Sequence, residues 1–150
     1  MKKIITKPGD YRFILNQPGQ ELEVVGRFRL DHDSVSRWDI EIIHAAPNTS
    51  SKTNIKGVVG DSARAFVTGT IKVLPEATGT EAFLEERILL VSENAKAEAT
   101  PNLEIETDEV HCSHAATVGK IDEEEIFYLQ SRGIKLKQAK NMIAEGFLSV

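Results

Sequence analysis

A cysteine and a histidine two positions apart offer the clearest chemistry in this chain. Cys112 is the sole cysteine, and it shares an alternation with Val110 and His114. Side chains two apart in a strand lie on the same face, whereas His111 falls on the opposite one. A thiolate and an imidazole displayed together can ligate iron, zinc or a nascent cluster. The alternative interpretation is that Cys112 is a small buried hydrophobic side chain.

The cysteine count limits what this pair can do alone. One cysteine cannot form an internal disulfide, and an iron–sulfur cluster normally takes about four protein ligands, mostly thiolates. Any cluster role therefore requires a second chain. Nucleophilic catalysis is disfavoured because Cys112 and His114 lie parallel on one strand, with no orienting Asn or Asp evident. A metal-dependent hydrolase using His111, Cys112 and His114 is a further alternative, which strand geometry opposes.

Other polar groups are interpreted as structural. Asp31-His32-Asp33 is predicted to be a solvated turn and not a metal site. His44 shares the parity of Trp38, Ile40 and Ile42, which predicts a half-buried strand histidine. Residues 57–60 lack the spacing and the Lys-Ser/Thr of a phosphate-binding loop. The carboxylates around Glu104 and Asp108 are most simply a solvated face, although either can supply an oxygen ligand to iron.

Composition excludes several classes of function. The chain has 150 residues, with 23 acidic against 18 basic side chains, so it carries no basic footprint for nucleic acid. No run approaches the length of a membrane-spanning helix. The start of the chain breaks at Lys7-Pro8-Gly9 before the apolar region of a signal peptide can form. We therefore expect a cytoplasmic protein of one domain that binds neither nucleic acid nor membrane.

Most of the chain has the alternation of β-strands, and part of it repeats. Residues 11–15, 22–30 and 38–42 alternate between apolar and polar side chains, with turns at 16–20 and 31–34. Placing 58–65 over 90–97, an offset of 32, matches residue character throughout. A fixed-period repeat of short strands is typical of a solenoid, and alanines at 63, 65, 95, 97 and 99 suit closely spaced sheets. A β-sandwich is the alternative.

The C-terminal segment changes to helical patterning. The first predicted helix spans about 122–132, with Asp122 as N-cap, Glu125 completing a capping box, and Gly133 after its end. The second spans about 136–148 and has an apolar stripe at intervals of three and four. We expect a β core over 1–120 and a helical segment over 121–150.

The region around Cys112 closely resembles a known family. The run LEIETDEVHCSHAATVGKIDEEEIFYLQSRGI resembles the C-terminal signature of the SufB/SufD proteins, the scaffolds of SUF iron–sulfur cluster assembly. The stretches IEIIHAAPNTSSKTNIKGVVGDSARAFVTGTIKV and GIKLKQAKNMIAEGF are similar to the same family. Together these stretches cover roughly residues 38 to 148, and they are nearer to the SufD branch.

The resemblance implies a fold and a role. It implies a right-handed parallel β-helix followed by a short helical region, in a SufD-like, shortened scaffold that is not an enzyme. Cys112 and His114 match positions implicated in binding iron or a transient iron–sulfur cluster at the interface with a SufB-like partner. The C-terminal helices would bind a SufC-type ABC ATPase, with the following candidate contacts: Phe127, Met142, Ile143 and Phe147. The alternative interpretation is that this apolar stripe only packs on the β core.

The chain also departs from the family pattern. Members are typically much longer, and their tails run beyond the position of Phe147. Ala115 stands where glycine is common, and Ile105 stands where the SufB branch has its strand cysteine. A shortened solenoid exposes the edge of its first coil, so we expect self-association, as a homodimer that buries β-helix ends or edges. A metal-free interaction module that binds the ATPase or a full-length scaffold is the alternative function.

Overall fold

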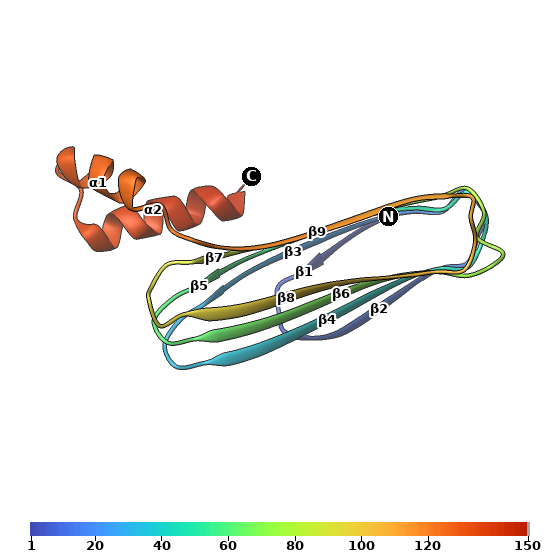
Figure 1. The fold of residues 1–150 in the computed structure, drawn as a ribbon, viewed down its shortest axis with the longest axis horizontal. Coiled ribbons are helices and arrows are strands. Elements are labelled where there is room, and N and C mark those ends of the chain that lie inside the picture. The colour runs from blue at the N-terminus through green and yellow to red at the C-terminus, as the bar shows by residue number, and fades with distance from the viewer. Residues whose placement is uncertain (150) are drawn as a thin grey trace.

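The protein consists of two facing parallel sheets followed by two helices (Figure 1). This computed structural model describes residues 1–149. The five-stranded sheet contains, in order, β1 (Lys2–Ile5), β3 (Glu21–Leu30), β5 (Ser50–Val59), β7 (Thr80–Leu90) and β9 (Val110–Lys120). The four-stranded sheet contains β2 (Gly9–Leu15), β4 (Val35–His44), β6 (Arg64–Val73) and β8 (Lys96–Ile105). Consecutive strands alternate between the sheets, and the predicted parallel β-solenoid is confirmed.

The repeat is real, but its period varies between the sheets. Arg64 pairs with Lys96, which is the expected offset of 32. In the other sheet Val58 pairs with Leu89, an offset of 31, so the predicted match of Val58 with Leu90 is wrong by one residue. The cause lies in the turns: residues 60–63 connect β5 to β6, whereas 91–95 connect β7 to β8. The turn at 91–95 has one residue more than the turn at 60–63. The offset is therefore 31 between β5 and β7, which precede these turns, and 32 between β6 and β8, which follow them.

Inward-facing side chains of both sheets form the core. Ala63 and Ala65 are fully buried, as the small side chains at these positions predict. Larger side chains fill the coils nearer the N-terminus, where the rings of Phe28 and Trp38 stack with centroids 4.8 Å apart. A Cβ on Gly57 would lie 2.1 Å from the Phe28 ring, so the glycine makes room for this stack. The interior is thus filled by small alanine side chains at some positions and by stacked aromatic rings at others.

The two predicted helices are present. The first, α1 (Glu123–Ser131), begins after Asp122, whose carboxylate accepts a hydrogen bond from the Glu124 amide at 2.9 Å. Within residues 1–149 the side-chain cap is this single bond, and the expected capping box with Glu125 does not form. At the end of α1, Gly133 has a φ of +86°, and its amide donates to the Gln130 carbonyl. The left-handed glycine lets the chain turn into α2 (Leu136–Ser149).

Helix α2 packs on the outer face of the five-stranded sheet (Figure 1). Ala144 is fully buried in a cluster with Val58 and Val91. Two basic side chains, Lys56 and Arg87, lie against the Phe147 ring, 5.4 Å from its centroid in each case. Neither described helix is both long and apolar enough to cross a membrane.

Candidate functional site

The C-terminal end of the solenoid is an open layer of half-buried side chains. Within the described chain β9 pairs only with β7, and β8 only with β6. The consequence is visible in equivalent residues: Val73 is 0% exposed, whereas its neighbour Ile105 on the last coil is 41% exposed. Likewise Ile88 is 2% exposed and its neighbour Val118 is 41% exposed. The inward face of the last coil is therefore accessible to a partner.

Cys112 lies in this open layer. It pairs with the buried Ala82 on β7 and packs at the border of an apolar cluster that includes Ile71 and Leu84. The thiol is free and half-buried. Burial raises its pKa, and a backbone hydrogen bond with Ala82 opposes this shift in part. The neutral thiol is thus favoured in the isolated chain, and metal binding must displace its proton.

His114 follows Cys112 on the same face of β9 and is exposed. Its register partner is Leu84, an inward-facing residue, whereas His111 pairs with the outward-facing Glu81. The structure therefore places Cys112 and His114 on one face, as predicted, and His111 on the other. Among residues 1–149 no three His, Cys, Asp or Glu side chains come together to hold a metal ion. Two side chains alone do not make a metal site.

The sequence interpretation missed Glu86, one coil below this layer. Its carboxyl group is fully buried on β7, where its register partner on β9 is Ala116. In the described chain neither carboxyl oxygen has a hydrogen-bond partner, and burial raises the pKa to about 7. The sequence does contain a signal for this burial, because Glu86 alternates with the apolar residues Leu84 and Ile88. It was hidden by the charged neighbours Glu85 and Arg87.

His44 is sealed inside the solenoid and takes no part in the open end. Its Nδ1 lies 2.8 Å from the Thr49 hydroxyl, and its Nε2 lies 2.8 Å from the Ser51 hydroxyl. Because Thr49 donates its own proton to the Ala46 carbonyl, Nδ1 carries the imidazole proton and Ser51 donates to Nε2. The ring is fully buried and not half-buried as predicted. Burial lowers its pKa to about 4.

The predicted turn at Asp31-His32-Asp33 has local partners. The Asp31 carboxylate pairs with Arg29 at 3.2 Å, and the His32 amide donates to the Asp61 carboxylate at 2.8 Å. The first contact lies within one turn, and the second connects the turns of successive coils. Both give the charged side chains of this turn a structural role.

The candidate partner residues divide into two pairs. Phe127 on α1 is 74% exposed, and Met142 on α2 is 50% exposed. Ile143 is half-buried, and Phe147 is half-buried against Lys56 and Arg87 of the solenoid. Phe127 and Met142 are therefore more accessible to another protein than Ile143 and Phe147.

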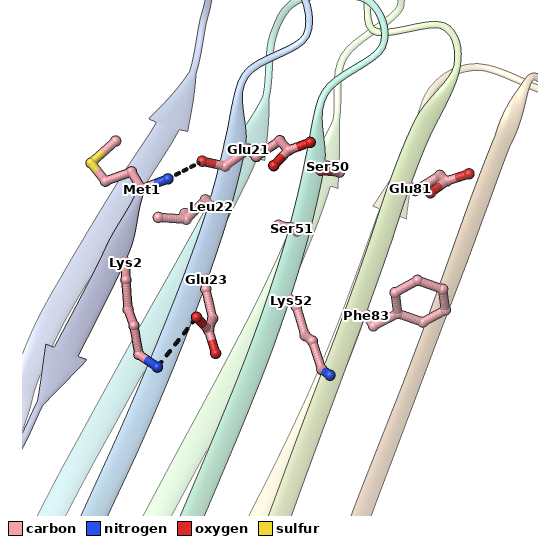
Figure 2. Close-up of a pocket in the computed structure, with 10 residues that line it drawn as sticks. All are labelled: Met1, Lys2, Glu21, Leu22, Glu23, Ser50, Ser51, Lys52, Glu81 and Phe83. Carbon is pink, nitrogen blue, oxygen red and sulfur yellow. Dashed lines mark hydrogen bonds and ion pairs between the residues drawn. The ribbon is translucent and has the colours of Figure 1, made fainter.

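A shallow hollow of about 500 Å³ lies on the five-stranded sheet (Figure 2). Figure 2 shows the Met1 amine bonded to the Glu21 carbonyl and the Lys2–Glu23 ion pair. Charges of both signs line the hollow, with Lys52 and Glu81 beside the aromatic ring of Phe83. This balance selects no charged ligand, and the hollow lies on the outward face of the sheet, whereas Cys112 lies on the inward face.

The architecture and its open end define a class of protein: a parallel β-solenoid that ends in a helical hairpin and presents a cysteine and a histidine on its last coil. A sequence model described as "SUF system FeS cluster assembly, SufBD core domain" matches residues 7–147. The chain belongs to this family.

Individual relatives agree with this assignment. An iron–sulfur cluster assembly SufBD family protein of Mycobacterium leprae is 37% identical over 138 residues, covering 87% of this chain and 35% of the relative. The SufD protein of Escherichia coli is 45% identical over 92 residues, covering 61% and 22%. That of Bacillus subtilis is 35% identical over 126 residues, covering 84% and 28%. The matched part is thus about a third or less of each relative.

Proposed function

We propose that this chain takes part in iron–sulfur cluster assembly as a SufD-like scaffold or accessory subunit and not as an enzyme. Cys112 and His114 bind iron or a nascent cluster at a subunit interface. The observation that carries the proposal is their position: a half-buried thiol and an exposed imidazole share the inward face of the last strand, where the solenoid is open. Membership in the SufBD core family supports it.

A second subunit completes this site. One thiol and one imidazole leave a cluster short of ligands, and the unpaired edges of β8 and β9 offer backbone groups for another chain. Closure by a SufB-like scaffold, or by a second copy in a homodimer, would add ligands and exclude water. The raised pKa of Cys112 suits this order of events, because the thiol stays protonated until a metal ion and its other ligands arrive.

The helical segment is the proposed contact for a SufC-type ABC ATPase. Residues 1–120 act as the solenoid core and residues 121–150 as the docking segment. Phe127 and Met142 are the stronger candidate contacts, because both are exposed apolar side chains on the hairpin. Ile143 and Phe147 contribute less directly, since they hold α2 on the sheet. We propose a cytoplasmic location, where a single free cysteine remains reduced.

Anaerobic reconstitution with ferrous iron and sulfide tests the site. The wild-type chain is expected to develop the visible absorbance of an iron–sulfur cluster, and the double variant Cys112→Ala with His114→Ala is expected to lose it. His111→Ala is the matched control, because His111 lies on the same strand but on the outward face. Full cluster absorbance in the double variant would exclude the assigned ligands.

A metal-free interaction module is the second candidate function. It is favoured by the incomplete ligand set at the open end and by the exposed Phe127. In this case the chain binds the ATPase or a full-length scaffold and carries no metal. Pull-down with the ATPase, combined with iron analysis of the complex, separates the two functions. Stable capture without iron after anaerobic loading would support the module, whereas iron bound in proportion to Cys112 would support the scaffold.

A further inference from the structure

Glu86 is a buried carboxyl group without a partner, directly beneath the coil that carries Cys112 and His114. Its side chain is fully buried, and in the described chain both oxygens lack hydrogen bonds. Its register partner on β5 is Ile55, an apolar residue that is itself sealed. An unpartnered buried carboxyl group is costly, so its retention in the core needs an explanation.

The interior leaves this carboxyl group no room to move inward. A Cβ placed on Gly69 of β6 would lie 2.5 Å from the Glu86 Oε1 atom and 2.7 Å from the Leu84 side chain. The carboxyl group therefore occupies the space left by the missing side chain of Gly69. Leu84 and Ile88 flank it on its own strand and face the same interior. Inward and sideways movement are both blocked.

Only one coil separates Glu86 from the open end. On β9 its neighbour is Ala116, and on β8 the neighbour of Gly69 is Pro101. Both covering residues are half-buried, and neither of their strands has a further partner in the described chain. The shortest route from the carboxyl group to water therefore passes through the last coil.

The charge state of Glu86 changes near neutral pH. Burial raises its pKa to about 7. The side chains that face it from β5, β6 and β8 are not titratable, and the titratable groups at inward positions of β9 are Cys112, His114 and Lys120. These three lie opposite Ala82, Leu84 and Leu90 and not opposite Glu86. An ionised Glu86 thus has no opposing charge at its own position, and it needs water.

We propose that ionisation of Glu86 loosens the coil formed by β8 and β9, and that this opening controls access to the half-buried thiol of Cys112. The protonated carboxyl group keeps the last coil packed. The carboxylate reaches water only when that coil moves outward. The role of this opening in regulating cluster assembly rests on the proposed function above. The opening itself is a property of the metal-free chain.

Hydrogen exchange of the β9 backbone amides in metal-free protein tests the opening. With a closed-state pKa of about 7 and an ordinary pKa in the open state, the opening constant rises about tenfold from pH 6 to pH 8, after correction for intrinsic exchange. In Glu86→Gln the corrected exchange is expected to be independent of pH. Glu85→Gln is the matched control, because Glu85 is the outward-facing neighbour, and it should behave as wild type.

Alkylation of Cys112 provides a second readout on the same proteins. Its rate, divided by the thiolate fraction at each pH, should follow the exchange data in wild type and lose the pH dependence in Glu86→Gln. Glu86→Leu gives a neutral variant without polar atoms and should also show no dependence. The same pH dependence in wild type and both Glu86 variants would overturn the proposal, as would its absence in wild type. Neither result involves iron binding, so the proposed function is tested separately.

Discussion

The Arg27 side chain on β3 donates a hydrogen bond from Nε to the Leu148 carbonyl oxygen near the end of α2, at 2.9 Å. Lys56 on β5 donates similarly to the Phe147 carbonyl oxygen at 3.3 Å. Helix α2 has no basic residue in its own last turn, and the sheet supplies the positive charge that a helix C-terminus prefers. The hairpin is therefore docked by polar contacts as well as by Ala144.

Arg27→Ala should weaken this docking. Loss of a hydrogen bond from a charged donor costs about 1.5 to 3 kcal/mol. The effect should be largest in α2, because the carbonyls of Gly26 and Asn54 that Nη1 also contacts belong to strands that keep their ladders. Hydrogen exchange of the α2 amides measures it. Arg12→Ala is the control, since Arg12 makes an exposed ion pair with Glu41. Equal protection of α2 in both variants would contradict the assignment.

Acid should destabilise the fold through His44. Burial lowers the pKa of this imidazole to about 4, so the unfolded chain binds its proton more readily than the folded chain. The contribution of His44 is complete above its ordinary pKa of about 6.5 and falls as the pH is lowered to 4, by about 3 kcal/mol. Urea unfolding of His44→Gln at several pH values should show a weaker loss in acid. If His44→Gln loses as much stability in acid as wild type does, His44 is not the cause of the acid destabilisation.

Glu86 should have the opposite effect on global stability. Its pKa is raised to about 7, so the folded chain retains the proton more readily than the unfolded chain. Its contribution is complete below about pH 4.5 and is lost as the pH rises through 7, by about 3 kcal/mol. Between pH 4.5 and 6.5, therefore, rising pH increases the contribution of His44 to the free energy of unfolding and decreases that of Glu86. Glu86→Gln should therefore reveal a steeper gain of stability with rising pH than wild type shows.

A methyl group at position 57 should damage the core. The Cβ of Gly57→Ala would lie 2.1 Å from the Phe28 ring, which is held by stacking on Trp38. Overpacking of this kind costs about 1 to 3 kcal/mol in the free energy of unfolding. Gly119→Ala is the matched control, because a Cβ on this β9 glycine meets no atom within 4 Å. Similar unfolding midpoints for the two variants would contradict the packing described.

Much of the fold was predictable because strand alternation and the alanine repeat are local signals. The strand β1 (Lys2–Ile5) was missed, since it is short, begins with two lysines and pairs with β3 alone among the described strands. The depth of His44 was underestimated, because its partners Thr49 and Ser51 come from the next turn and strand. The alternation of side chains along a strand correctly predicted that Cys112 and His114 lie on one face. No third ligating side chain joins this pair in the described part of the chain, so the sequence could not predict one.

The most direct measurement separates the chain by size under anaerobic conditions after reconstitution with ferrous iron and sulfide, with light scattering for mass and iron analysis of each fraction. Because one chain offers a single thiol, iron and sulfide should elute only with a dimer or with a complex containing a SufB-like partner. Cys112→Ala should abolish this bound iron. A cluster that elutes with the monomer, or that persists in Cys112→Ala, would contradict a site completed by a second subunit.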